Sequence, residues 1–153
     1  MRLIVFAFVF MIFVASNILA AGLGITEIDV HVDYDEAYTY KVENRDRINS
    51  ASVPVANNSR IDADVLPGSN ITFTIRVENT FQGEKPDLRD VFVTMTIEGT
   101  DDDVEDLEEK SIDFDLEPGN DNRVDVKFNI PLGIEPGTHN VKIEAEGEDA
   151  NGT

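Results

Sequence analysis

The 153-residue sequence lacks cysteine and tryptophan altogether, and it has only 12 lysine and arginine residues against 31 acidic ones. Without cysteine the chain has no disulfide, no thiolate metal site and no cysteine nucleophile. Secreted eukaryotic domains of this size often carry disulfides, so the composition fits an exported prokaryotic protein better. The formal net charge of −19 repels phosphate backbones, which argues against nucleic acid as a partner.

Recognisable catalytic patterns are also missing. The sequence contains no Gly-x-Ser-x-Gly elbow, no phosphate-binding loop and no zinc pattern. Its two histidines, His31 and His139, are far apart, and we interpret them as a surface residue and a packing residue. A glycosidase cleft needs aromatic walls as well as paired carboxylates, and the absence of tryptophan argues against one. We therefore predict that the protein is not an enzyme, with a small secreted hydrolase as the least favoured alternative.

The N-terminus has the pattern of an export signal. Met1 and Arg2 precede an uninterrupted apolar run from Leu3 to Ala15, and the small residues Ala20-Ala21-Gly22 follow. This order predicts a signal peptide over residues 1–22, cleaved before Leu23. The alternative is an uncleaved transmembrane helix, because the segment is long enough to span a bilayer. Both interpretations place the rest of the chain outside the cytoplasm, with membrane contact only through this segment.

The mature chain is patterned with period two. Ile71, Phe73, Ile75 and Val77 alternate with Thr72, Thr74, Arg76 and Glu78 after a Pro67-Gly68 turn, which predicts a half-buried strand ending at Asn79. The same alternation predicts strands over residues 28–35, 91–98, 112–117, 124–130 and 139–146, and a brief one over 61–65. We expect a long polar loop up to residue 60, with at most one short edge strand, and one helical turn around Val104 and Leu107.

These strands predict an all-β fold. No amphipathic helix is apparent after residue 23, and six or more short strands with one apolar face each are typical of a two-sheet antiparallel β-sandwich. The expected organisation is the signal or anchor helix over residues 1–22, a first strand and polar loop over 23–60, and the sandwich body over 61–153. The sequence Asn151-Gly152 favours a hairpin turn, so we expect the last strand of the sandwich to be missing.

Three similar Pro-Gly turn motifs precede strands: Leu66-Pro67-Gly68-Ser69, Leu116-Glu117-Pro118-Gly119 and Glu135-Pro136-Gly137-Thr138. With the strand ending at Asn79, this pattern resembles the immunoglobulin-like modules of prokaryotic, chiefly archaeal, cell-surface proteins, the group of CARDB-type adhesion-related and S-layer-associated domains. The resemblance covers about residues 61–148. It implies an immunoglobulin-like sandwich that serves as a spacer or adhesive unit. His139 stands where such modules usually have tyrosine, which puts the corner hydrogen bond of that tyrosine in doubt.

Two kinds of site are predicted. The acidic run contains Asp101, Asp103 and Asp106, whose carboxylates are candidate calcium ligands, although the run fails as an EF-hand loop and a solvated acidic loop is the alternative. The sequence has three glycosylation sequons, where chance predicts about one. They place candidate acceptors at Asn57, Asn70 and Asn151, and Asn57 in the polar loop is the best of them.

We therefore expect an exported, non-catalytic structural or adhesive module at the cell surface, without a cofactor other than calcium. The alternative is a carbohydrate- or calcium-binding module that uses the acidic run and the rings of Tyr34, Tyr38 and Tyr40. Expected partners are other cell-surface proteins, or a strand from another chain added to an open sheet edge. The sequence does not specify the ligand or the oligomeric state.

Overall fold

The computed structural model describes residues 9–13, 22–33, 48–49, 53–54, 59–61, 65, 67–82, 87–99, 105–134 and 137–149, and the strands at 9–13 and between 48 and 61 by backbone alone. These parts are all-β and contain no helix. The strands are β1 (Val9–Phe13), β2 (Leu23–Asp33), β3 (Ile48–Asn49), β4 (Val53–Pro54), β5 (Ser59–Ile61), β6 (Asn70–Asn79), β7 (Leu88–Ile97), β8 (Leu107–Lys110), β9 (Phe114–Leu116), β10 (Asp121–Asn129) and β11 (Thr138–Asp149).

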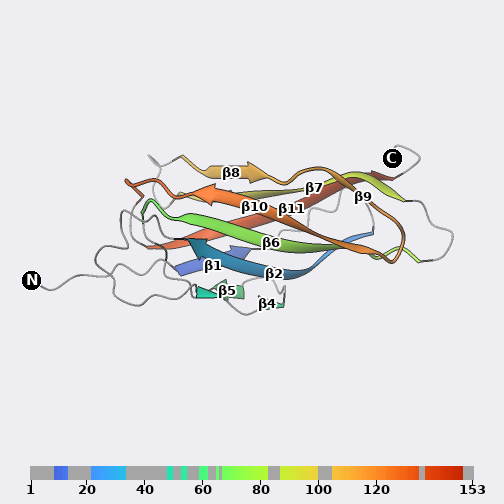
Figure 1. The fold of residues 1–153 in the computed structure, drawn as a ribbon, viewed down its shortest axis with the longest axis horizontal. Coiled ribbons are helices and arrows are strands. Elements are labelled where there is room, and N and C mark those ends of the chain that lie inside the picture. The colour runs from blue at the N-terminus through green and yellow to red at the C-terminus, as the bar shows by residue number, and fades with distance from the viewer. Residues whose placement is uncertain are drawn as a thin grey trace, which may run out of the picture.

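The strands form two sheets, drawn in Figure 1. The first sheet has the order β5-β1-β11-β7-β8, with β9 also beside β7, and the second has the order β10-β6-β2-β3, with β4 also beside β2. All pairs are antiparallel except β1 with β11, which is parallel. The predicted all-β fold with antiparallel sheets is thus confirmed.

β6 is the central long strand of the second sheet, as its alternating pattern indicates. It pairs with β10 from Asn70 to Glu78, and with β2 on its other side. Pro67-Gly68 and Pro118-Gly119 both form turns, in which Gly68 and Gly119 have φ angles of 83° and 77°. A positive φ after proline is the requirement of a type II turn, which glycine meets without strain. The sequence prediction of these two turns is confirmed.

The apolar faces of both sheets meet in one core. Phe73 of β6 and Phe128 of β10 make an edge-to-face contact with their ring centroids 5.9 Å apart. The core is continuous along the sandwich and comprises Leu23, Ile28, Val30, Val32, Val65, Ile71, Phe73, Ile75, Val77, Leu88, Val91, Val93, Met95, Ile97, Leu116, Val124, Val126, Phe128, Ile130, Val141, Ile143 and Ala145. The polar residues of each alternating strand consequently form the two outer faces.

Two β-bulges extend strands further than simple alternation allows. In β2 the pairing with β6 shifts between Ile25 and Glu27, so Thr26 is an extra residue. In β7 the pairing with β11 and with β9 shifts around Asp90, which has a positive φ of 49°. An inserted residue exchanges the inward and outward positions of a strand. The bulge in β7 therefore lets Leu88 point inward together with Val91.

Four expectations need correction or remain open. Leu107 begins a strand, β8, because its segment pairs with β7, so the expected helical turn is wrong at this residue. Ile112 is 81% exposed instead of inward-facing, since it lies in the connection between β8 and β9. The polar region up to residue 60 contains two short strands, β3 and β4, and the start of β5, instead of one strand at most. Asn151-Gly152 lies outside the described residues.

Of residues 1–22 the structure describes Val9–Phe13, which is strand β1, and Gly22. The other residues of the expected signal or anchor lie outside the described part, so the helix there stays a prediction. Within the described ranges, no helix is long and apolar enough to cross a membrane.

Candidate functional site

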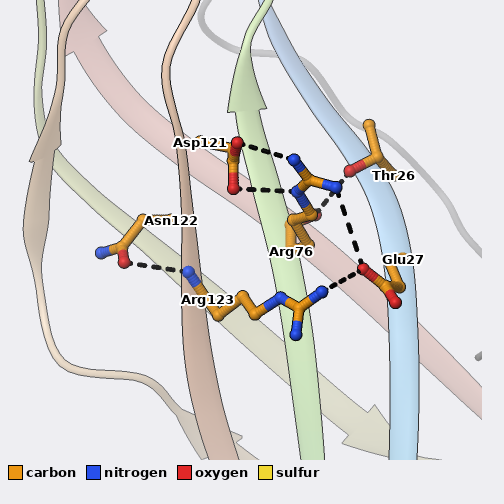
Figure 2. Close-up of polar contacts among 6 residues, drawn as sticks. All are labelled: Thr26, Glu27, Arg76, Asp121, Asn122 and Arg123. Atoms are coloured by element: carbon orange, nitrogen blue, oxygen red, sulfur yellow. Dashed lines mark hydrogen bonds and ion pairs between the residues drawn. The ribbon is translucent and has the colours of Figure 1, made fainter.

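The outer face of the second sheet carries a cross-strand network of charged residues, shown in Figure 2. Arg76 of β6 makes a bidentate interaction with Asp121 of β10, with Nε to Oδ2 at 2.8 Å and Nη2 to Oδ1 at 2.7 Å. Arg123 of β10 donates from Nη2 to Oε2 of Glu27 in β2 at 2.6 Å, and Nη1 of Arg76 lies 4.0 Å from the same oxygen. We call these four residues the charged network.

The network compensates for an unfavourable pairing register. Arg76 lies directly opposite Arg123, and Asp121 lies directly opposite Glu78. Like charges at directly opposed positions destabilise a sheet. The diagonal interaction of Arg76 with Asp121, and the interaction of Arg123 with Glu27 across β6, bring opposite charges together instead. The two ion pairs thus join three strands that are distant in sequence.

The ionisation of the pair follows from its geometry. The hydrogen bond from Arg76, followed by its positive charge and that of Arg123, lowers the pKa of Asp121 despite some desolvation. The hydrogen bond and charge of Asp121 raise the pKa of Arg76. The Arg76 and Asp121 side chains remain 40% and 37% exposed, so water and salt screen the pair. This arrangement can fix strand register, and it offers no activated nucleophile or general base.

A polar hollow of about 620 Å³ adjoins this network at one end of the sandwich. Asp121 belongs to both features, and the other lining residues are Asp87, Arg89, Asp90, Asp115, Leu116, Glu117, Asn120 and Asn122. Several of its polar groups are engaged within the chain: Oδ1 of Asp115 accepts a hydrogen bond from the Asp90 backbone N–H at 3.2 Å, and Asn120 donates to Glu117 at 3.2 Å. Across the described residues, no three His, Asp or Glu side chains are arranged to hold a metal ion.

The predicted calcium ligands are only partly described. Asp106 lies in the structure, and its Oδ1 accepts a hydrogen bond from the Gly99 backbone N–H at 2.9 Å. This contact closes the loop between β7 and β8 at its base. Asp101 and Asp103 lie outside the described residues, so a calcium site in this loop stays a prediction.

Of the three sequons, only the one at Asn70 can be placed. Asn70 is exposed and is the first residue of β6. Its Oδ1 accepts a hydrogen bond from Nδ2 of Asn129 at 3.1 Å, while its own Nδ2, the atom that a glycan would modify, takes no part in that bond. Asn57 and Asn151 lie outside the described residues, as do Tyr34, Tyr38 and Tyr40.

The two histidines lie in different environments. His31 lies on the outer face of β2, with Nε2 3.0 Å from a carboxylate oxygen of Asp33. His139 is 1% exposed, and its Nδ1 lies 3.3 Å from the backbone carbonyl oxygen of Glu98. It borders a shallow, mainly apolar hollow of about 360 Å³ at its end of β11. The interpretation of His31 as a surface residue and of His139 as a packing residue is confirmed.

Sequence reasoning missed the role of Asn79, although it identified the strand that Asn79 ends. Asn79 is 0% exposed. Its Nδ2 donates to the Leu116 carbonyl at 3.0 Å and its Oδ1 accepts from the Phe81 N–H at 3.0 Å. Its backbone N–H donates to Asn120 and its carbonyl accepts from Gly119, both at 2.9 Å. The sequence signal for this corner was a polar residue at an apolar position of the alternation, at the end of the strand.

Comparison with known proteins adds no relative: no family model, no curated protein and no solved structure matches the chain.

Proposed function

We propose that the protein is an exported, non-catalytic β-sandwich module of immunoglobulin-like type, with a structural or adhesive role at the surface of a prokaryotic cell. The observation that carries the proposal is that the sandwich has a continuous apolar core and an outer face on which ion pairs join neighbouring strands. Such a body is a rigid unit whose exposed faces and edges are available for contacts. The likeness of its Pro-Gly turn motifs to those of the CARDB-type and S-layer-associated modules supports the same role.

The charge and the N-terminal pattern support the location. A net charge of −19 keeps an exposed protein soluble in a saline medium. The apolar run after Arg2 supports export, either with cleavage before Leu23 or with retention as an anchor. In both cases the sandwich lies outside the cytoplasm.

Labelling of intact cells tests the location. Cells of a prokaryotic host that produce the full chain are treated with a membrane-impermeant amine reagent, and the modified peptides are identified by mass spectrometry. Lys127 is exposed on β10 and should be labelled. Lys142 should react less, because its Nζ lies 2.9 Å from Glu144 and the side chain is 38% exposed. Labelling of Lys127 only after lysis would contradict the proposal.

The adhesive role needs its own test. Cells that carry the chain should aggregate or attach to a surface more than cells without it. A Phe73→Asp variant, which places a charge in the core, should abolish this difference because the module unfolds. If cells with the chain, cells without it and cells with the variant attach equally, the adhesive role is contradicted and only the structural role remains.

A carbohydrate- or calcium-binding module is the second candidate. The acidic run that ends at Asp106 favours calcium, and the polar hollow near Asp121 offers hydrogen-bonding groups to a carbohydrate. Calorimetric titration with millimolar calcium chloride should then release or absorb heat and raise the melting temperature. Neither effect would be seen if these carboxylates only form a solvated surface.

A further inference from the structure

We propose that folding of the sandwich decides whether the N-terminal segment is removed, because the folded corner at Gly22 shields the bond that an export peptidase would cut. This inference rests on the proposed export of the chain and adds its regulation. The sequence predicts cleavage between Gly22 and Leu23. Hydrolysis there adds water across the peptide bond and leaves a carboxyl group on Gly22 and an amino group on Leu23. In the structure Leu23 belongs to the second sheet, and Gly22 lies against the end of β6.

The carbonyl oxygen of Gly22 is already engaged as a hydrogen-bond acceptor. The backbone N–H of Thr80 donates to it at 2.6 Å, and the hydroxyl group of Thr80 donates to it at 2.8 Å. A peptidase attacks the carbonyl carbon of the bond that it cuts, and the donors of its oxyanion hole have to reach this oxygen. A carbonyl oxygen has two lone pairs for such bonds, so Thr80 competes directly with the enzyme.

The ring of Phe81 covers Gly22 itself. A Cβ atom at residue 22 would lie 2.7 to 2.8 Å from three carbons of this ring, so the folded corner has no room for a side chain there. Gly22 also has a φ of 120°, a conformation that residues with a side chain rarely adopt. The fold therefore requires glycine at the position where the peptidase requires a small residue. We call Thr80 and Phe81 the clamp.

Leu23, on the other side of the bond, is held in the core. It is 5% exposed and begins β2 opposite Asn79 of β6. A peptidase has to bind the residues on both sides of the bond, which requires Leu23 to leave the core. Cleavage of a folded chain then proceeds only through a local opening, at a rate set by the open fraction. Chains cut before this corner forms are released, and chains that fold first keep the N-terminal segment.

Addition of the peptidase at two times tests the proposal. The full chain is synthesised in a cell-free system with detergent, and purified prokaryotic signal peptidase is either present from the start or added after folding. Circular dichroism verifies that the chain has folded before the late addition, and mass spectrometry measures the fraction of chains that begin at Leu23. Cleavage should be at least about tenfold slower when the enzyme meets the folded chain, because only the open fraction is cut.

Gly22→Ala separates the demands of the fold from those of the peptidase. Alanine is an accepted small residue at such a cleavage site, but its Cβ would displace the ring of Phe81. The folded variant should therefore be cut several-fold faster than the folded parent, whereas the two should be cut equally during synthesis. Gly133→Ala is the matched control, because its Cβ would meet nothing within 4 Å, and it should behave like the parent at both times.

Thr80→Val tests the hydrogen bond without a change in size. It removes the hydroxyl donor to Gly22, so the folded variant should be cut faster than the folded parent. Thr74→Val is the matched control, since it removes a hydroxyl donor to Asp125 elsewhere on the second sheet, at 2.7 Å. It should not change the rate of cleavage. Urea unfolding of both variants shows whether a difference in rate reflects the corner alone or the stability of the whole sandwich.

The outcomes that overturn the proposal are distinct. Equal rates at both times of addition would refute the protection of the bond and leave export intact. Slow cleavage of the folded chain that neither Gly22→Ala nor Thr80→Val accelerates would refute the clamp as its cause. A lack of cleavage at both times would refute the use of this bond. Labelling of Lys127 on intact cells then distinguishes a chain that is exported with its N-terminal segment from one that is not exported.

Discussion

Replacement of the buried Asn79 by alanine should destabilise the sandwich more than any single exposed substitution. The change removes the donor to the Leu116 carbonyl and the acceptor for the Phe81 N–H. Leu116 is 3% exposed, so water has little access to replace the donor that its carbonyl would lose. Leaving this acceptor without the Asn79 donor should cost about 1–3 kcal/mol. The N–H of Phe81 is only partly buried, and loss of its bond costs about 0.5–1.5 kcal/mol. The free energy of unfolding should fall by about 2–4 kcal/mol.

Urea unfolding followed by circular dichroism measures this loss, and a matched control comes from the same corner. Asn120 is exposed, and its side chain donates only to Glu117. Asn120→Ala should therefore change the free energy of unfolding by less than about 1 kcal/mol. If Asn79→Ala destabilises the protein no more than Asn120→Ala does, the corner does not hold the sandwich together and the reasoning is wrong.

Asn79→Asp adds a test with a defined sign. The new carboxyl group would be buried and its second oxygen would face the Leu116 carbonyl, so its pKa in the folded state should be raised. The folded variant then binds a proton more tightly than the unfolded chain does. Relative to the parent, the variant should be most stable below about pH 4 and should lose stability as pH rises through the folded-state pKa. A destabilisation that does not depend on pH would contradict this account.

Three further outcomes follow from other parts of the fold. The pKa of Asp121 is lowered, chiefly by its hydrogen bond from Arg76, so the pair should stabilise the protein above about pH 4 and lose this effect as pH falls through the lowered pKa. In urea unfolding at several pH values, Asp121→Asn should remove that part of the acid dependence. If the stability of the variant and of the parent depends on pH in the same way, the reasoning is refuted. Gly147→Ala should cost about 1–3 kcal/mol, because the new Cβ would lie 2.8 Å from a methyl carbon of a buried valine in β7. Gly133→Ala, whose Cβ would meet nothing within 4 Å, should cost far less, and equal melting temperatures of the two variants would contradict the clash. Glycopeptide mass spectrometry of protein from its native cells should find Asn70 modified, and an entirely unmodified peptide would refute its use as an acceptor.

The sequence specified the strands and turns that depend on local chemistry. In β6 the alternation of apolar and polar residues determined both the strand and its buried face, because a period of two fits only an extended chain with one face in the core. The turns at Gly68 and Gly119 were predictable because proline and glycine together favour a positive φ at the second position. The inward position of His139 followed from the same alternation.

Only the tertiary structure decided features that depend on partners distant in sequence. The bulges at Thr26 and Asp90 are defined by the strands opposite them. Leu107 lies in a strand because its segment pairs with β7. Asn79 makes three of its four hydrogen bonds to a corner formed by residues 116–120, and the fourth joins it to the backbone of Phe81. The sequence by itself therefore determined the all-β character and the inward faces of the main strands. The order of the strands, the charged network and the enclosure of Asn79 were decided by contacts between segments that no local pattern relates.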